Sequence, residues 1–155
     1  MEKLLGLGLI ATAAYCFFYF AHSRQRALMD STAHDVVRLL SRCQELASSS
    51  QSSAGQGLVK VIFRPRGGAY QSLTITVDGQ VADQREFEPG IFLVNTNGLV
   101  VSDELWIRED GALVKDASGT PRDQPDPGYL TVAGENVAEL RLIEVRPAVG
   151  SFLLR

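Results

Sequence analysis

Cysteine and histidine are scarce in this chain of 155 residues, which contains two of each. Two cysteines are too few for a disulfide-dense secreted scaffold. His22 and His34 are too far apart in sequence to form the i, i+4 pair of a helical zinc site. The sequence also has no CxxC pair, P-loop or GxSxG motif. We therefore expect no catalytic set, no metal and no cofactor, and a protein that is not an enzyme.

A basic excess is missing as well. The chain has 15 Lys and Arg against 18 Asp and Glu, a formal net charge of −3. A general nucleic-acid binder would normally carry a strong positive charge. Charged residues make up 21% and apolar residues 45% of the chain, which excludes both a wholly disordered chain and a polytopic membrane protein. The length fits one ordinary domain.

One long apolar run occurs near the start of the chain. Residues 4–21 carry no charge and, as a helix, would span about 27 Å, close to the ~30 Å of a bilayer core. Aromatic residues crowd the end of the run, as at a membrane interface. These residues are Tyr15, Phe17, Phe18, Tyr19 and Phe20. We predict that residues 1–21 form a membrane-spanning helix. A cleaved secretory signal, for which an Ala-x-Ala site is missing, and a buried helix of a soluble bundle are the alternatives.

The helical pattern continues beyond the apolar run, because neither Gly nor Pro occurs between Ala21 and Gly55. An apolar side chain recurs every three or four residues, which predicts a single stripe along one helix face. This stripe, called the helix seam below, consists of Met29, Ala33, Val36, Leu40, Cys43 and Ala47. We predict that residues 22–49 are an amphipathic extension of the same helix, with the helix seam packed against a β-sheet.

The whole helix is expected to run from about Lys3 to Ala47, a length of about 67 Å. Cys16 and Cys43 would lie about 40 Å apart on it and could not form a disulfide with each other. Residues 50–57 are rich in Ser and Gly. They are expected to end the helix and to form a linker.

From residue 58 onward the apolar period changes to two, which is typical of strands. Asp78-Gly79, Asn97-Gly98 and Asp110-Gly111 indicate turns between them. The predicted strands are 58–63, 70–77, 80–87, 91–95, 99–101, 104–109, 112–117, 129–134, 138–145 and 150–155. We therefore predict that residues 58–155 form an antiparallel β domain. The expected fold class is α+β, with the long N-terminal helix packed on this sheet.

Two acidic groups of the β domain could carry chemistry, but each has a simpler interpretation. Asp123 and Asp126 could bind calcium together with loop carbonyls, or form a plain turn. Glu109 and Asp110, close to Trp106, could be paired carboxylates, or the turn of a hairpin. We favour the turn in both cases.

Arg64, Arg66 and Tyr70 form a small basic and aromatic group in the sequence. Such a group could contact DNA, or it could cap a turn, which is the interpretation we favour. Trp106 lies in an alternating segment and is expected in the core.

This order of elements resembles that of type IV pilins and pseudopilins, in which an apolar N-terminal helix continues as an amphipathic helix and is followed by an antiparallel sheet. The second half is similar to the minor, H-type (FimT-like) pseudopilins. Residues 105–111, LWIREDG, occupy the place of a family segment of the form I-x-F-x-x-x-G. Gly150 precedes the last apolar strand, as a glycine does in the family.

The resemblance implies a short leader that ends in Gly and is removed by prepilin peptidase. Gly6 and Leu7 would flank such a cut. We expect the mature chain to retain residues 1–6, with a start at Leu7 as the alternative. The fifth mature residue would then be Ala11, where pilins usually carry Glu. A minor pilin at a fibre tip lacks the usual need for that Glu.

The resemblance also implies a function, namely that of a minor pilin or pseudopilin-like structural subunit. Such a subunit helps to assemble or prime a type IV pilus-related filament or a type II secretion pseudopilus. The implied partners are the inner membrane, other pilin-like subunits through the N-terminal helix, and a secreted substrate or DNA at the tip. No small-molecule substrate is evident.

The implied location is a single-pass position in the inner membrane with the β domain periplasmic or extracellular. Arg24 and Arg26 follow the apolar run and, by the positive-inside rule, would instead place the β domain in the cytoplasm. We favour the location that the family architecture implies. The alternative function is a bitopic membrane protein whose extracytoplasmic β domain binds a ligand or partner and does not enter a filament.

Overall fold

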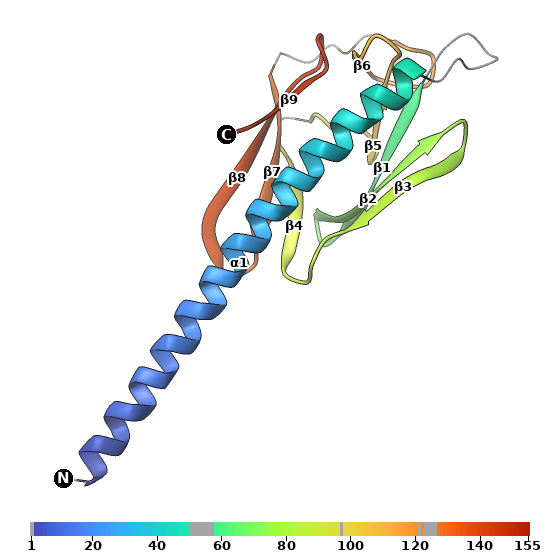
Figure 1. The fold of residues 1–155 in the computed structure, drawn as a ribbon. Coiled ribbons are helices and arrows are strands. Elements are labelled where there is room, and N and C mark those ends of the chain that lie inside the picture. Colours follow the sequence, from blue (N-terminus) through green and yellow to red (C-terminus); the bar gives the residue numbers. More distant parts are fainter. Residues whose placement is uncertain (1, 50–57, 97, 121, 123–126) are drawn as a thin grey trace.

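The computed structural model consists of one long helix and a nine-stranded antiparallel sheet that packs along the second half of that helix (Figure 1). It describes residues 2–49, 58–96, 98–120, 122 and 127–155, with side chains from Thr12 onward. The predicted α+β arrangement, a long N-terminal helix packed on an antiparallel sheet, is confirmed. The elements are α1 (Glu2–Ser49), β1 (Val59–Arg66), β2 (Ala69–Val77), β3 (Gln80–Glu86), β4 (Ile91–Thr96), β5 (Glu104–Ile107), β6 (Leu113–Val114), β7 (Gly128–Gly134), β8 (Val137–Arg146) and β9 (Ser151–Leu154).

Helix α1 extends two residues beyond the predicted end at Ala47. Its last turn contains Ser48 and Ser49, whose hydroxyls donate to the carbonyls of Glu45 and Leu46. The predicted linker at residues 50–57 lies outside the described residues.

The side chains of residues 2–11 lie outside the described part of the structure, so the predicted membrane-spanning segment is described as backbone from Glu2 and with side chains only from Thr12. Over the part of the chain that the structure describes, no helix carries an apolar stretch long enough to cross a membrane.

The strands follow the order β6-β5-β1-β2-β4-β7-β8-β9, and β3 pairs with β2 beside this path. Asp78 and Gly79 join β2 to β3 with φ angles of 51° and 78°. Two positive φ angles in a two-residue loop are the geometry of a type I′ turn, which matches the twist of an antiparallel pair. The turn predicted from the Asp-Gly dipeptide is therefore present.

The core lies between the helix seam and the inner face of the sheet. All six residues of the helix seam have an exposed fraction of 0%. On the sheet, alternate residues turn inward toward them, among them Leu73 of β2, Leu93 of β4 and Leu130 of β7, each also fully buried. The apolar face of the helix, which repeats every 3.6 residues, thus packs against the inner faces of the strands, which repeat every two residues. Together they form one continuous apolar cluster.

The sheet curls until its two ends touch beside the helix. The Leu113 backbone N–H of β6 donates to the Pro147 carbonyl, just after β8, over 2.9 Å. Gln44 of α1 donates from Nε2 to the carbonyl oxygen of Gly111 over 3.3 Å and also to that of Gly150. The Gln44 amide therefore ties both ends of the sheet to the helix, and we refer to this contact as the Gln44 clasp.

Two details differ from the expectations. Residues 99–101 form only an isolated bridge, Val101 with Glu104, because Ser102 and Asp103 turn the chain back at once with positive φ angles. The expectation that Trp106 lies in the core is also wrong. Its neighbours in β5 point inward, whereas the Trp106 ring is half-buried on the outer face, where the Lys60 ammonium lies 5.1 Å from the ring centre. The attraction between this cation and the ring offsets part of the burial that the Trp106 side chain loses on the outer face.

The helix seam should be essential for stability. We expect Leu40→Asp to lower the free energy of unfolding by about 4 kcal/mol or more, because it removes a buried side chain and places an unpaired charge in the core. Ala27→Asp is the matched control, because Ala27 is exposed on the same helix. Denaturant unfolding of the full chain, followed by circular dichroism, provides the measurement. Equal losses in the two variants would mean that the helix does not pack on the sheet as described.

Gly150 lies where the two ends of the sheet meet, and this position should tolerate no side chain. A Cβ at Gly150, whose φ is +62°, would overlap the Gly111 carbonyl oxygen, so Gly150→Ala should cost about 3 kcal/mol or more. Gly119 has a φ of +76° but no atom near its Cβ position, so Gly119→Ala should cost only about 1 kcal/mol. The melting temperatures of the two variants provide the measurement. Both variants carry the backbone strain, so the difference between them reports the cost of the steric overlap at Gly150. Similar melting temperatures would contradict the contact between the sheet ends.

Candidate interaction surfaces

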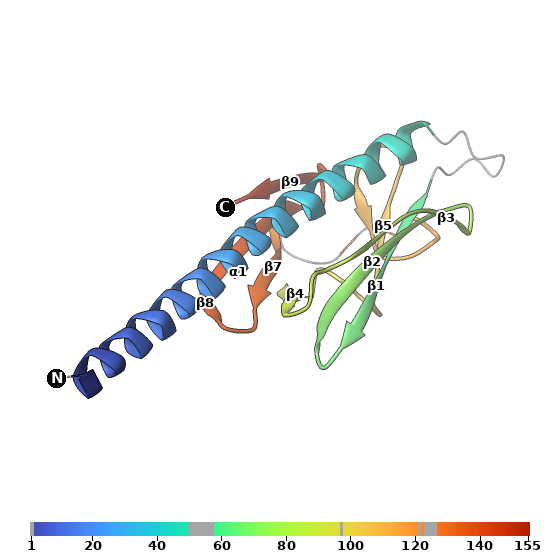
Figure 2. The same cartoon turned by 60° about the horizontal axis from the view of Figure 1, so that its bottom comes forward.

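The N-terminal part of α1 projects well beyond the sheet, as both views of the fold show (Figures 1 and 2). The first fully buried residue along the described helix is Met29. Before it, five aromatic side chains are 64–74% exposed, and they are Tyr15, Phe17, Phe18, Tyr19 and Phe20. We call these five residues the aromatic cluster.

An exposed group of this kind is unusual, because soluble monomers rarely leave large contiguous apolar patches in water. The rings provide about 25 cal/mol of stabilisation for each Å² of apolar surface that a partner or a lipid phase covers. The aromatic cluster can therefore act as an interaction surface, and helical geometry holds it rigidly in line with the buried half of α1.

The buried half of α1 is flanked by ion pairs to the sheet on both sides. On the β8 side, Arg26 contacts Glu139 over 2.5 Å, and Asp30 pairs with Arg141. On the β3 side, Asp35 contacts Arg85 over 2.6 Å. Arg26, Asp30 and Asp35 thus each have a charged partner on a strand next to the helix.

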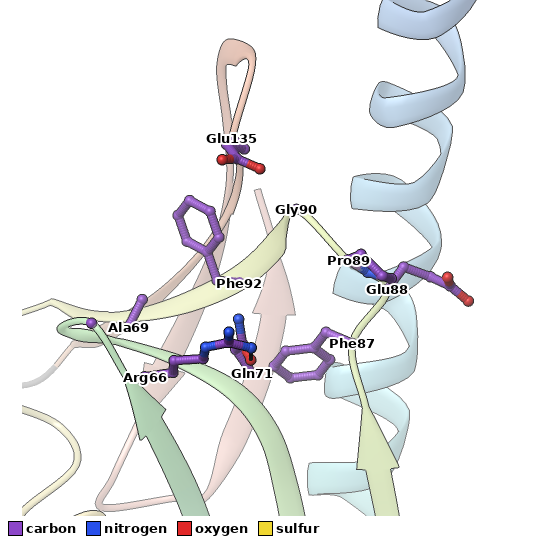
Figure 3. A pocket seen from close by; sticks show the side chains of 10 residues that line it. Arg66, Ala69, Gln71, Phe87, Glu88, Pro89, Gly90, Phe92 and Glu135 are labelled. Atoms are coloured by element: carbon purple, nitrogen blue, oxygen red, sulfur yellow. Dashed lines mark hydrogen bonds between the residues drawn. The ribbon is translucent and has the colours of Figure 1, made fainter.

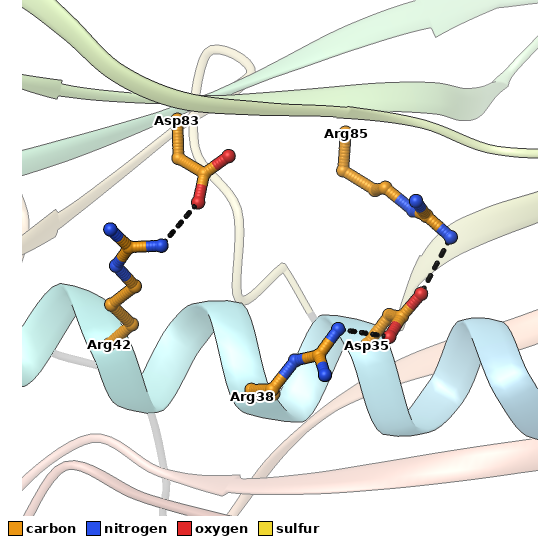
Figure 4. A network of polar contacts seen from close by, with 5 residues as sticks. All are labelled: Asp35, Arg38, Arg42, Asp83 and Arg85. Carbon is orange, nitrogen blue, oxygen red and sulfur yellow. Dashed lines mark hydrogen bonds and ion pairs between the residues drawn. The ribbon is translucent and has the colours of Figure 1, made fainter.

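On the β3 side two separate ion-pair links join the helix to strand β3 (Figure 4). Arg42 donates to Asp83 over 3.0 Å, and Asp35 accepts from both Arg85 and Arg38 over 2.6 Å each. Strand β3 is exposed along nearly its whole length. Its links to the helix are therefore mainly electrostatic, unlike those of the strands that share the core.

A groove opens where the sheet splits. Strand β2 pairs with β3 from Ser72 to Val77, but with β4 only at Tyr70. Strands β3 and β4 diverge from this point, and residues 87–90 connect them across the gap. The space between them, called the sheet groove here, measures about 640 Å³. Its lining includes Arg66, Ala69, Gln71, Phe87, Phe92 and Glu135.

The sheet groove combines aromatic walls with a polar floor (Figure 3). The rings of Phe87 and Phe92 are both half-buried, and in this view the Phe87 ring lies beside Gln71 whereas the Phe92 ring points toward Glu135. Arg66 donates to Gln71 Oε1 over 3.2 Å, and among the described residues it has no acidic partner. Glu135 lies at the rim. Such a site suits an apolar group that also carries hydrogen-bonding groups, because the charged side chains of the lining are Arg66, Glu88 and Glu135.

A second hollow, of about 580 Å³, lies between the projecting helix and the connection that bears Glu88 and Pro89. Its helix side includes Phe17, Phe20 and Leu28 together with Arg24. The hollow adjoins the sheet groove, because Glu88 and Pro89 line both. The aromatic cluster and the sheet groove therefore lie at the same end of the β domain.

The structure does not bring the histidines or the cysteines together. His22 is half-buried and His34 exposed on α1. Cys16 is exposed and Cys43 buried, and both are free thiols. Burial raises the pKa of Cys43 to about 12, so its thiol is unreactive at neutral pH. Among the described residues, no group of three or more His, Cys, Asp or Glu side chains is placed to hold a metal ion.

Asp110 takes part in an exposed turn rather than in a carboxylate pair. The Arg108 side chain donates to its carboxylate, and the Asp110 carboxylate accepts from the Ala112 backbone N–H over 3.0 Å. The Arg108 hydrogen bond holds the pKa of Asp110 below its usual value. Glu109 is exposed next to it.

The basic and aromatic group of Arg64, Arg66 and Tyr70 does not form one surface. The Tyr70 side chain is buried, and its hydroxyl donates to Asp103 over 3.1 Å. Burial, followed by the nearby Asp103 carboxylate, raises the pKa of Tyr70 to about 12. The two arginines remain exposed.

Several predicted residues lie outside the part that the structure describes. They are the side chains of Gly6 and Leu7 at the predicted leader site, and Asp123 and Asp126 of the predicted calcium loop. The predicted turn at Asn97-Gly98 is described only at Gly98.

Sequence reasoning missed the sheet groove. Its lining comes from three separate stretches of the chain, and the split that opens it depends on how β3 and β4 share one edge of β2. The one signal in the sequence is Phe87-Glu88-Pro89-Gly90, in which a proline and a glycine interrupt the strand pattern between two phenylalanines.

A scan against protein-family models and searches of the curated proteins and of the solved structures each find no match to this chain.

The Asp35 ion pairs should stabilise the fold in a salt-dependent manner. We expect Asp35→Asn to lower the free energy of unfolding by about 0.5–1 kcal/mol at low ionic strength. The difference should shrink in 1 M salt, where the screening length is about 3 Å. Glu45→Gln is the control, because Glu45 is an exposed acid on the same helix with no ion pair to a described residue. A loss that is the same at both salt concentrations would indicate packing instead of charge.

Proposed function

We propose that this chain is a minor pilin-like or pseudopilin-like structural subunit. In this proposal residues 4–21 anchor it in the inner membrane, and the β domain lies on the periplasmic or extracellular side. The subunit helps to assemble or prime a type IV pilus-related filament or a type II secretion pseudopilus. Its role is structural, because it acts by packing against neighbouring subunits and by no chemical reaction.

One observation supports the proposal most directly, namely that one half of α1 is buried against the sheet and the other half is exposed to solvent. The helix seam packs against the sheet, whereas the aromatic cluster on the same unbroken helix is exposed. A monomer gains nothing from a projecting apolar helix in water, but a subunit that packs against other apolar helices or lipid does. The resemblance in element order, from the projecting helix to the closing strands, supports the same conclusion.

A second candidate is a bitopic membrane protein whose β domain binds a ligand. The sheet groove supports it, because clefts of about 300–1,000 Å³ with aromatic walls and a few polar groups are typical of small-molecule sites. The two candidates share the anchored helix and differ in what contacts the aromatic cluster.

Photo-cross-linking from the aromatic cluster tests the proposal. Phe18, 73% exposed, is replaced by p-benzoylphenylalanine in the full chain in its native host, and His34, exposed on the packed half of α1, is replaced as the control. We expect adducts at position 18 with one or more chains that themselves begin with an apolar helix followed by a β domain, and few at position 34. The reason is that a filament subunit buries its projecting helix against others. Mass spectrometry identifies the partners.

Adducts with lipid alone would contradict the filament role and favour the bitopic ligand-binding protein. The location is read in the same cells from Ala117→Cys in a Cys16→Ser background. Ala117 is exposed in the β domain, and Cys43 is too deeply buried to react. An impermeant maleimide should label residue 117 in intact spheroplasts, whereas labelling only after lysis would place the β domain in the cytoplasm and contradict the proposal.

A further inference from the structure

The hollow between the projecting helix and the β domain, called the helix hollow below, has one charge of each sign. In the part of the chain that the structure describes, its lining contains one base, Arg24, and one acid, Glu88. Neither makes an ion pair with any described residue, so the two charges line one space without pairing with each other. Glu135 lines the adjoining sheet groove and not the helix hollow.

The wall that carries Glu88 is a rigid turn held against the helix. The Glu88 carbonyl accepts the backbone N–H three residues later over 2.9 Å. Pro89 and Gly90 occupy the two central positions, and the φ of Gly90 is 79°, which is the geometry of a type II turn. The Gly90 carbonyl also accepts from Gln25 Nε2 of α1 over 3.3 Å. The position of Glu88 across the helix hollow is therefore fixed by its backbone.

The helix side of the hollow changes character along α1. Leu28, at one end, packs partly buried against the core of the β domain. Phe17 and Phe20, at the other end, are 74% and 70% exposed. Arg24 lies between them, one helical turn from Phe20 and one from Leu28. The helix therefore offers apolar rings and then, one turn later, a guanidinium, which is the order of acyl chains and phosphate in a lipid.

The position of Arg24 along the helix matches the depth of a lipid phosphate. It lies three residues beyond Ala21, where the predicted membrane-spanning run ends. At about 1.5 Å per residue this places it about 4.5 Å past the end of the run. Each headgroup layer of a bilayer is roughly 5–7 Å thick, so Arg24 falls within it when residues 4–21 cross the hydrocarbon core. In this respect the inference rests on the proposed function.

We propose that the helix hollow binds one zwitterionic phospholipid whose headgroup ends in a primary ammonium, as in phosphatidylethanolamine. Arg24 pairs with the phosphate, the ammonium donates to the Glu88 carboxylate, and the acyl chains run along Phe20 and Phe17. An anionic headgroup would place a second negative charge beside Glu88. A choline headgroup has no N–H to donate to the carboxylate. The primary ammonium lipid is the occupant that matches both charges of the hollow and its apolar side.

Native mass spectrometry of the full chain tests the site. The chain, solubilised in detergent, is mixed with equal amounts of phosphatidylethanolamine, phosphatidylcholine and phosphatidylglycerol that share the same acyl chains, so that only the headgroups differ. We expect one lipid to remain bound. Phosphatidylethanolamine should be retained about tenfold more often than either of the others, because it alone pairs with both charges.

Two variants separate the roles of the two charges. Glu88→Gln should abolish the preference for phosphatidylethanolamine over phosphatidylcholine, because the ammonium loses its carboxylate. Arg24→Gln should lower the retention of all three lipids about fivefold, because each carries a phosphate. Arg26→Gln is the matched control for depth, because Arg26 lies two residues further along α1 but pairs with Glu139 outside the hollow. Glu109→Gln, at an exposed acid of another turn, is the control for Glu88.

Three outcomes would each overturn the site. They are equal retention of phosphatidylethanolamine and phosphatidylcholine, an unchanged preference in Glu88→Gln, and equal losses in Arg24→Gln and Arg26→Gln. Glycerophosphoethanolamine, which is the same headgroup without acyl chains, is added as a competitor. We expect it to leave the lipid bound, because it cannot contact the rings of α1. Displacement of the lipid at equal concentration would overturn a lipid as the occupant.

The outcome is separable from that of the proposed function. The filament role is read from protein adducts at position 18, on which the headgroup preference does not depend. The preference together with lipid adducts alone at position 18 would keep the site and contradict the filament subunit. Protein adducts at position 18 without the preference would contradict the site alone.

Discussion

The burial of the helix seam against a curled sheet is the constraint on which the rest of this structure depends. In the described part of the chain, nine strands of one antiparallel sheet have an apolar inner face that must be covered, and half of α1 covers it. The curl brings β6 close to the β8–β9 turn, and the Gln44 clasp fixes this closure to the helix. Because the inner face is occupied in this way, the sheet groove lies at an edge of β2 and the aromatic cluster lies on the part of α1 beyond the sheet.

One helix therefore performs two tasks without a break between them. From Met29 onward it is part of a domain core, and before Met29 it is an exposed rod with aromatic side chains. The transition falls beside Arg26 and Asp30, where ion pairs to β8 flank the last solvent-exposed turn. A rigid connection of this kind transmits the position and direction of the β domain to whatever surrounds the rod.

Much of this arrangement could be predicted from the sequence, because it depends on two simple repeats of apolar residues, one for the helix and one for the strands. Steps of three and four residues identified the buried helix face, and the alternating segments with their Asp-Gly turns identified most strands. The misjudged details depend on contacts between distant residues. Trp106 alternates as a core residue would, but the register of β5 with β1 places it outward beside Lys60. The sheet groove depends on how two strands divide one edge of β2, which no local pattern encodes.

The contacts along the buried half of α1 also determine how the molecule responds to force. A pull on the projecting helix acts along the helix axis, nearly parallel to the seam. The apolar contacts from Met29 to Ala47, the ion pairs on both flanks and the Gln44 clasp then carry the load in parallel and in shear. A load in shear must break many weak contacts at once, whereas peeling breaks them one after another. The same packing that defines the fold thus makes the joint between rod and domain resistant to tension.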